Sequence, residues 1–210
     1  MGQYEMTLSL GVIDHLGLNL YSNIPAVISE LVANAWDADA TEVDISIDTV
    51  HRVITIQDNG VGMSDSEVNA KFLTVGYRRR EHGPTTTRRG RHVMGRKGIG
   101  KLSTVSIANE IEVQSAKSAK VKAALVMTTD GIREIIDQNQ GTYLPTPVDV
   151  SAVEFDRGTR LVLRKLRRRP SQSTIAALRR RLARRFSIIG AEHDFKVVIN
   201  GDDVGVEDRD

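Results

Sequence analysis

The sequence predicts an α+β fold, a two-layer α/β sandwich in which helices cover one face of a mixed β-sheet. An amphipathic helix near the start precedes two short alternating runs, and four further strand-like runs follow residue 110. These strands come in adjacent runs rather than in strict β-α-β alternation, which is typical of the α+β class. The 210 residues, 40% of them hydrophobic, suit one domain with a buried core.

The first helix is expected to begin at Asn23-Ile24-Pro25, because asparagine is a good N-cap and proline is tolerated in the first turn. Its buried side is predicted by apolar residues at helical spacing, namely Ile24, Val27, Ile28, Leu31, Val32 and Ala35. Alternating residues over 43–47 and 53–56 predict a β-hairpin. A loop over 58–63 then leads into a short helix capped by Ser64 or Asp65.

Residues 76–100 show no periodicity, and a loop of this length in a compact domain is usually a lid or a binding loop. Strand-like runs follow at 111–115, 121–129, 159–166 and 195–200. A basic helix is expected over 173–187, with Leu178, Leu182 and Phe186 forming a narrow apolar edge that docks on the sheet.

Composition excludes several classes of site. The chain has no cysteine, which removes disulfides, thiolate metal sites and thiol nucleophiles, and its five histidines are too scattered to suggest a metal centre. There is no run of eighteen apolar residues and no signal-peptide pattern. We therefore expect a cytoplasmic protein with no membrane partner.

Charge is distributed unevenly along the chain. Residues 1–77 contain two basic and eleven acidic residues, whereas residues 78–210 contain 27 basic and 16 acidic residues. This division suits a site for a magnesium-bound polyanion, and it suits equally well a plain domain with polarised faces.

A polar stripe runs along the first helix. Glu30, Asn34 and Asp37 stand at i, i+4 and i+7, so they lie on one face of the helix. A carboxylate can take a proton from water, and a carboxamide oxygen can ligate Mg²⁺. The alternative is an ordinary solvated helix face.

Two glycine-rich segments follow. In the loop from Asp58 to Met63, glycines let the backbone approach a flat ligand, and Asp58 can accept a hydrogen bond from an exocyclic amine. In residues 95–103, glycines free backbone N–H groups to bind phosphate, and Lys101 adds a charge. Each segment is also compatible with a plain turn, and the second fits neither a P-loop nor a dinucleotide fingerprint.

The order and spacing of four motifs closely resemble the N, G1, G2 and G3 boxes of the GHKL superfamily. This group comprises gyrase, heat-shock chaperones, histidine kinases and MutL-type ATPases, which share the Bergerat ATP-binding fold. The matching segments are Glu30-x-x-x-Asn34-x-x-Asp37-Ala38, Asp58-x-Gly60-x-Gly62, Gly95-x-x-Gly98-x-Gly100 and Gly158-Thr159. The resemblance covers residues 10–205. Within the superfamily, the chain looks most like the chaperone-like and microrchidia (MORC) ATPases.

The resemblance implies Mg²⁺-dependent binding of ATP and its slow hydrolysis to ADP and phosphate. It makes Glu30 the base that activates water, Asn34 the ligand of Mg²⁺, and Asp58 the acceptor for the adenine amino group, assisted by Thr159. It places the remaining nucleotide contacts at Asp37, Ala38, Gly60, Gly62, Met63, Gly95, Lys97, Gly98, Ile99, Gly100, Lys101 and Leu102.

The same resemblance implies one ATP-binding domain over 1–210, with an ATP lid at 76–100. An N-terminal segment, residues 1–20, is expected to exchange between subunits of an ATP-dependent homodimer. Related ATPases continue into a transducer domain, so we expect this chain to be the N-terminal part of a longer protein.

The last feature is a basic run over residues 164–185, which holds ten arginines and lysines and no acid. Such a run suits nucleic acid or an acidic partner, although it also suits a solvated face. With 4% aromatic residues, base stacking on single strands is not expected. Two functions therefore stay open, an ATPase and a nucleotide-gated, DNA-directed binding module with negligible turnover. A histidine kinase is a distant third.

Overall fold

The computed structural model describes residues 3–7, 23–74, 85–94, 103–138, 142–186 and 193–210. Most of the predicted N-terminal segment and lid lies outside these residues, as do the seven predicted site residues from Gly95 to Leu102.

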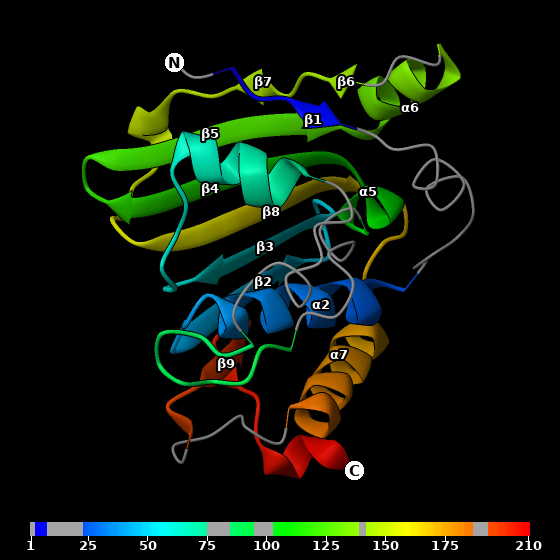
Figure 1. Ribbon diagram of the computed structural model, residues 1–210. Coiled ribbons are helices and arrows are strands. Elements are labelled where there is room, and N and C mark those ends of the chain that lie inside the picture. Colours follow the sequence, from blue (N-terminus) through cyan, green and yellow to red (C-terminus); the bar gives the residue numbers. More distant parts are fainter. Residues whose placement is uncertain (1–2, 8–22, 75–84, 95–102, 139–141, 187–192) are drawn as a thin grey trace.

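An eight-stranded mixed sheet forms the centre of the fold, in the order β10-β9-β2-β3-β8-β4-β5-β7 (Figure 1). Strands β2 and β9 pair in parallel, and every other pair of described strands is antiparallel. The strands are β2 Glu42–Asp48, β3 Val53–Asp58, β4 Ala108–Ser118, β5 Val121–Thr128, β7 Thr146–Pro147, β8 Gly158–Leu166, β9 Lys196–Ile199 and β10 Asp202–Asp203, with β1 Met6–Thr7 and β6 Thr142–Tyr143 in a separate pair.

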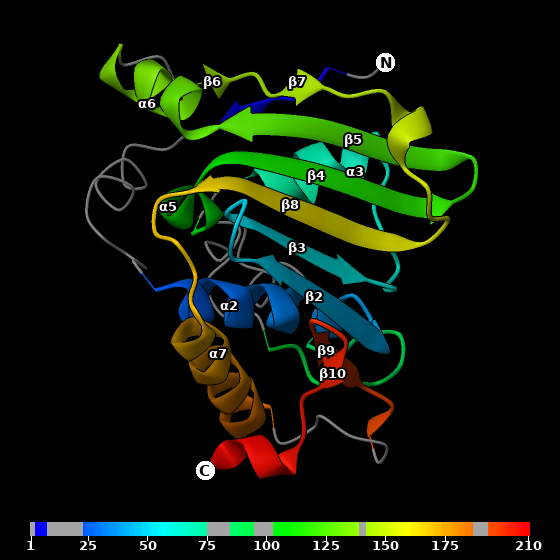
Figure 2. The same cartoon turned by 180° about the vertical axis from the view of Figure 1, so that it is seen from behind.

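Helices cover one face of this sheet, which confirms the predicted α+β class. Helices α2, α3 and α5 lie over the same face in Figure 1, and the central strands turn their other face to the viewer in Figure 2. Strand β2 shows the cause, because its buried residues alternate with exposed ones and only one face is covered. The helices are α2 Ile24–Asp37, α3 Asp65–Glu67, η1 Val68–Leu73, α5 Thr104–Ile107, α6 Thr129–Asp137, η2 Val150–Ala152, α7 Gln172–Arg185 and η4 Val206–Arg209.

Helix α2 forms as predicted. Asn23 is its N-cap, Pro25 lies in its first turn, and all six residues of the predicted stripe are buried in the core. Ser64, rather than Asp65, caps the short helix α3, and its side chain and that of Glu67 form a capping box.

Helix α7 confirms the basic helix, but not its expected position. Its apolar edge, Leu178 and Leu182, is fully buried. The helix packs mainly against α2 and η4 rather than docking on the sheet (Figure 1). The reason is that α2 already covers this part of the sheet, so α7 buries its edge against α2.

Candidate functional site

Asp58 ends strand β3 at the junction between the sheet and α2. Its Oδ1 accepts a hydrogen bond from the Gly60 amide at 2.8 Å, and it lies opposite Thr159 in strand β8. Burial raises the pKa of Asp58 to about 6, although hydrogen bonds from the backbone N–H groups of Gly60 and Thr159 oppose this shift. The sheet thus holds a carboxylate in a poorly hydrated position beside the glycine loop.

Ser115, on strand β4, connects this loop to the sheet. Its hydroxyl accepts from the Met63 amide at 2.9 Å, lies 2.9 Å from the Thr159 hydroxyl, and donates to the Gly158 carbonyl at 3.1 Å. Ser115 is fully buried. Ser115 was not predicted as a site residue. Its position, a polar residue on the buried side of the alternating run 111–115, was a signal that could have identified it.

Two glycines allow the loop and the strands to come this close. Gly62 has φ +62°, and a Cβ there would lie 1.9 Å from the carbonyl oxygen of Ala116. Gly158 has φ +111°, and a Cβ there would lie 1.9 Å from the carbonyl oxygen of Asp58. No other residue type fits either position without moving the backbone.

The C-terminal end of α2 is bonded to both neighbouring loops. The Ala38 carbonyl accepts from the Val61 amide at 2.9 Å, and Asp37 Oδ1 accepts from the Met94 amide at 2.7 Å. Asp37 is buried, so its predicted contact with the nucleotide competes with this structural role.

Residues 85–94 are held against the same end of α2. The Trp36 indole donates to the His92 carbonyl at 2.9 Å, and the Arg91 guanidinium lies 4.1 Å from the Trp36 ring centroid. Arg91 is buried and donates to the carbonyls of Ala40 and Asp194, at 2.5 and 2.9 Å. The described part of the predicted lid is therefore anchored, by residues that the sequence analysis did not select.

Glu30 and Asn34 lie farther toward the N-terminus of α2, with Glu30 about 10 Å from Asp37 along the helix axis. Glu30 Oε1 accepts from Arg185 Nη1 at 2.7 Å, and the same nitrogen donates to Ser29 Oγ at 2.9 Å. The Asn34 side chain is partly exposed and makes no hydrogen bond with any residue that the structure describes. The contact with Arg185 was not predicted.

The predicted site residues thus fall into groups. Contacts join Asp37, Ala38, Asp58, Gly60, Gly62, Met63 and Thr159 into one cluster at the ends of α2, β3 and β8. Glu30 and Asn34 form a second group on α2, and the segment from Gly95 to Leu102 is outside the described residues.

The donor set suits Mg²⁺ only with help from a ligand. In the described part of the chain, no three His, Asp or Glu side chains gather as a metal site. Mg²⁺ commonly uses one or two protein ligands together with phosphate oxygens and water, so the single Asn34 carboxamide fits a nucleotide-borne ion.

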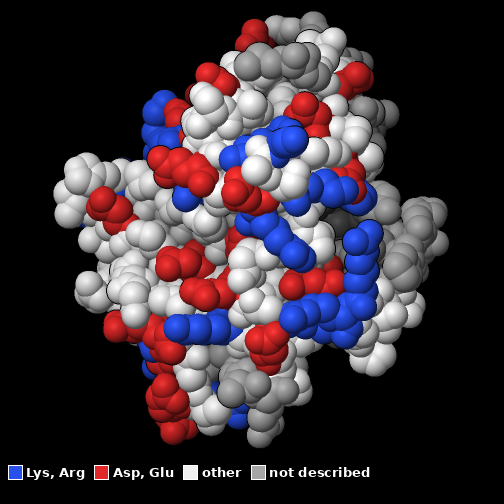
Figure 3. Space-filling view, turned by 90° about the vertical axis from the view of Figure 1, so that its left-hand side faces the viewer, with Lys and Arg blue, Asp and Glu red and all other residues white. Residues whose placement is uncertain are grey.

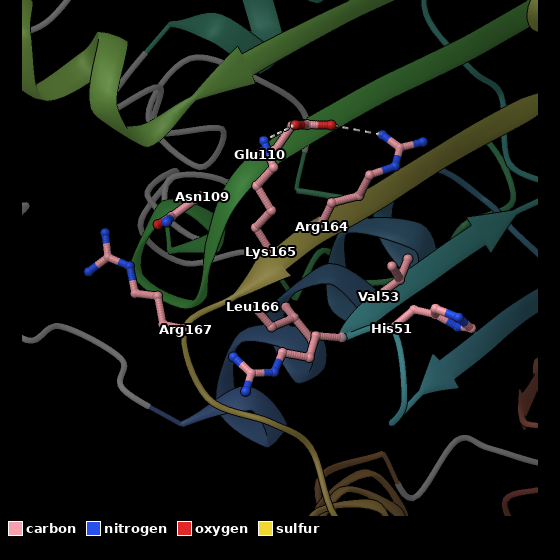
Figure 4. Close-up of a pocket in the computed structure, with 9 residues that line it drawn as sticks. His51, Val53, Asn109, Glu110, Arg164, Lys165, Leu166 and Arg167 are labelled. Carbon is pink, nitrogen blue, oxygen red and sulfur yellow. Dashed lines mark hydrogen bonds and ion pairs between the residues drawn. The ribbon is translucent and has the colours of Figure 1, made fainter.

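Two surface hollows lined by described residues lie elsewhere. One, of about 670 Å³, is on the uncovered face of the sheet, where Figure 4 shows Glu110 between Arg164 and Lys165. The Lys165 ammonium is 3.0 Å from Glu110, and the Arg164 guanidinium is 2.7 Å from Glu112. The other, of about 600 Å³, lies between α2 and α7. None of the described helices is both long and apolar enough to cross a membrane.

Comparisons with known proteins show the family of the chain. Residues 21–159 match the family of histidine kinase-, DNA gyrase B- and HSP90-like ATPases. The chain is 43% identical to a putative type II restriction enzyme, HgiDII, of Herpetosiphon aurantiacus, over 99% of this chain and 33% of the relative.

Bacterial chaperones are also similar to this chain. The chaperone protein HtpG of Nitratidesulfovibrio vulgaris is 28% identical over 77% of this chain and 30% of its own length. HtpG of Helicobacter hepaticus is 29% identical over 68% of this chain and 27% of its own length. The chain spans about a third of the length of these curated relatives. It belongs to the family of histidine kinase-, DNA gyrase B- and HSP90-like ATPases.

Proposed function

We propose that this domain binds ATP with Mg²⁺ and hydrolyses it slowly to ADP and phosphate. The observation that best supports this proposal is the position of Asp58, a partly buried carboxylate beside the Gly60 amide and Thr159. An ionised carboxylate only accepts hydrogen bonds, so it selects a ligand that presents a donor. The adenine amino group is such a donor, and a nearby Thr159 hydroxyl adds a second polar group.

The phosphates and Mg²⁺ are assigned to the rest of the predicted set. We assign Mg²⁺ to Asn34 and the phosphate oxygens to backbone N–H groups between Gly95 and Leu102, with Lys97 and Lys101 as charge partners. Bound Mg²⁺ supplies Lewis acidity at the γ-phosphate. Lid closure over residues 76–100 and dimerisation through residues 1–20 belong to the same proposal.

Glu30 is proposed to take a proton from the attacking water. In the structure its Oε1 is engaged by Arg185, so this contact must loosen before both carboxylate oxygens can serve water. We expect turnover by this chain to be slow for that reason and because lid closure limits many such reactions.

Steady-state phosphate release from the wild type and from Glu30→Ala tests the proposal. Loss of a general base lowers turnover by about 10²–10⁴-fold, so Glu30→Ala should be nearly inactive. Its affinity for ATP, measured by calorimetry, should stay close to that of the wild type. Glu42→Ala is a matched control, because Glu42 is an exposed glutamate at the start of strand β2.

A second function is favoured by one observation, the similarity to a putative restriction enzyme. It is a nucleotide-gated, DNA-directed module that holds ATP with negligible turnover. In that case Glu30→Ala leaves a trace rate unchanged. A histidine kinase would instead transfer labelled phosphate to protein. The likeness to microrchidia ATPases stays a prediction.

A further inference from the structure

A basic groove runs between the N-terminal end of α2 and helix α7. It has a volume of about 600 Å³, and both helices lie side by side in Figures 1 and 2. Among the described residues its charged lining comes from α7, where the spacing i, i+1, i+4 and i+5 places two rows of side chains on one face. The lining residues are Asn23, Pro25, Ala177, Arg180, Arg181, Arg184 and Arg185.

The structure separates these arginines from the rest of the basic run. Arg179 is paired with the Asp208 carboxylate at 2.7 Å, and Arg164 with that of Glu112 at 2.7 Å. By contrast, Arg180 and Arg184 donate only to main-chain oxygens, those of Asp210 and Arg209, at 3.0 and 2.7 Å. Arg181 has no hydrogen bond or ion pair with any described residue. Three of the four guanidinium groups in the groove therefore have no ion pair with a described side-chain carboxylate.

The opposite side of the molecule has a different pattern. Figure 3 shows basic and acidic side chains intermixed there. Outside the groove, basic side chains form ion pairs with carboxylates, for example Lys122 with Asp156 at 3.2 Å and Arg89 with Asp194 at 3.0 Å. Paired charges of this kind attract a polyanion only weakly, which makes the groove the stronger candidate.

Helix α2 adds to the positive potential of the groove. Its first turn contains no acidic residue, and the Asn23 side chain makes no capping hydrogen bond. The positive end of the helix dipole thus faces the same space as the arginines. Both features favour an anion.

The linear charge density fits duplex DNA. Residues 180–185 rise about 7.5 Å along α7, so their four arginines supply about one charge per 2 Å. Duplex DNA presents one phosphate per about 1.7 Å of its axis. No aromatic side chain is among the described residues that line the groove, and these residues therefore do not support stacking on single-stranded bases. Arginine forks also match phosphate geometry better than lysine does.

We propose that this groove binds the sugar-phosphate backbone of duplex DNA, and that Arg185 couples this binding to ATP turnover. Arg185 lines the groove and also donates to Glu30 Oε1 at 2.7 Å. A phosphate that engages Arg185 competes with Glu30 for the guanidinium. DNA then releases the carboxylate proposed to activate water, and turnover rises. The coupling rests on the proposed ATPase function, whereas the binding surface does not.

Fluorescence anisotropy with a labelled 20-base-pair duplex tests the surface. Three phosphate contacts give a salt slope of about −2.7, or roughly 40-fold weaker binding between 50 and 200 mM salt. The triple variant Arg180→Ala, Arg181→Ala, Arg184→Ala should lose most of this affinity and salt dependence. The control triple, Lys120→Ala, Arg133→Ala, Arg168→Ala, removes three exposed charges outside the groove and should bind as the wild type does.

Three results would overturn the proposal that the groove binds duplex DNA. The first two are wild-type affinity in the groove triple and an equal loss of affinity in both triples. The third is displacement of the duplex by poly-glutamate at matched charge, which would assign the groove to an acidic protein. Melting temperatures of both triples near that of the wild type show that folding is retained.

Phosphate release at saturating duplex tests the coupling. Wild-type turnover should rise several-fold with DNA, whereas Arg185→Ala should turn over ATP at a DNA-independent rate, and Arg185→Lys should recover part of the response. A wild-type rate that DNA does not change overturns the coupling. Absence of any turnover together with tight, salt-dependent duplex binding overturns the ATPase proposal and the coupling with it, but upholds the surface.

Discussion

Two regions of the molecule, the C-terminal end and the middle of helix α2, differ in how their candidate functional side chains are held. At the C-terminal end, Asp58 and Thr159 are fixed by sheet register, by the hydrogen bond from the Gly60 amide to Asp58, and by the contact between the Thr159 and Ser115 hydroxyls. Midway along the helix, Glu30 is held by Arg185, a side chain from a different helix. The first arrangement is set largely by the backbone of two central strands and cannot change without breaking their pairing. The second depends on one exposed ion pair.

This difference suggests that the C-terminal end of α2 serves nucleotide binding and that Glu30 serves control of hydrolysis. The C-terminal end, where we propose that the adenine base binds, is preorganised by backbone geometry, so binding there costs little ordering of its groups. A carboxylate controlled by a side-chain contact can instead be switched, because exposed ion pairs contribute little energy and exchange readily. Substitutions around Asp58 and Thr159 test the rigidity of the C-terminal end of α2.

Gly62→Ala should displace the glycine loop beside Asp58 and so have the largest effect. The added Cβ would lie 1.9 Å from the Ala116 carbonyl oxygen, at φ +62°. We expect at least a hundredfold loss of ATP affinity by calorimetry, with a lower melting temperature. Gly201→Ala is the matched control, since Gly201 also has positive φ but nothing within 4 Å of its Cβ position. An equal effect of the two substitutions would mean that backbone strain, not the close approach, is responsible.

The pH dependence of stability tests the burial of Asp58. Its pKa is raised from 3.8 to about 6 in the folded protein, so the folded state binds the proton more tightly than the unfolded state. The contribution of Asp58 to the free energy of unfolding is therefore fully present below pH 4. It falls by up to about 3 kcal/mol as the pH rises through 6.

The measurement is the free energy of unfolding from denaturant titrations between pH 4 and 7. The quantity to compare is the difference in the free energy of unfolding between the wild type and Asp58→Asn. Other carboxyl groups, such as Glu67, whose pKa is lowered to about 2, are present in both proteins, so their contributions cancel. A difference that stays constant across this range would contradict the account of Asp58.

Ser115→Ala should have the smallest effect. It leaves the Met63 amide and the Thr159 hydroxyl without their buried partner, which costs about 1–3 kcal/mol of stability. We expect ATP affinity to fall about tenfold, because the loop is less firmly placed. Ser46→Ala, on the exposed side of β2, is the control and should leave both quantities unchanged. Wild-type affinity in Ser115→Ala would show that the loop does not need this hydroxyl.

Local patterns in the sequence predicted the elements that local chemistry determines. The start of α2 at Asn23, the β2–β3 hairpin and strand β8 were predicted from local residue patterns, and the structure confirms them, although the Asn23 side chain makes no capping hydrogen bond. Helix α6 was missed because strand-like residues run up to Thr128, whose side chain then caps the helix by accepting from the Gly131 amide. Ile132, Ile135 and Ile136 carry a helical spacing that was not used.

Candidate site residues could be predicted from the sequence where they belong to a recognised motif. Resemblance to known boxes selected Asp58 and Thr159, although 101 positions separate two residues that the β3–β8 register places opposite each other. Ser115 and Arg185 belong to no motif. Their roles depend on which strand and which helix the fold places beside the boxes, and spacing along the chain does not contain that information.

The most direct test of the central claim is a calorimetric titration of ATP, and of a non-hydrolysable analogue, into wild type and Asp58→Asn with and without Mg²⁺. Replacing one carboxylate oxygen by an NH₂ group sets a donor against the adenine amino group. The account predicts saturable binding to the wild type and a loss of at least tenfold to a hundredfold in Asp58→Asn, with an unchanged fold by circular dichroism. Equal affinity for the two proteins would contradict the assignment of Asp58 to adenine.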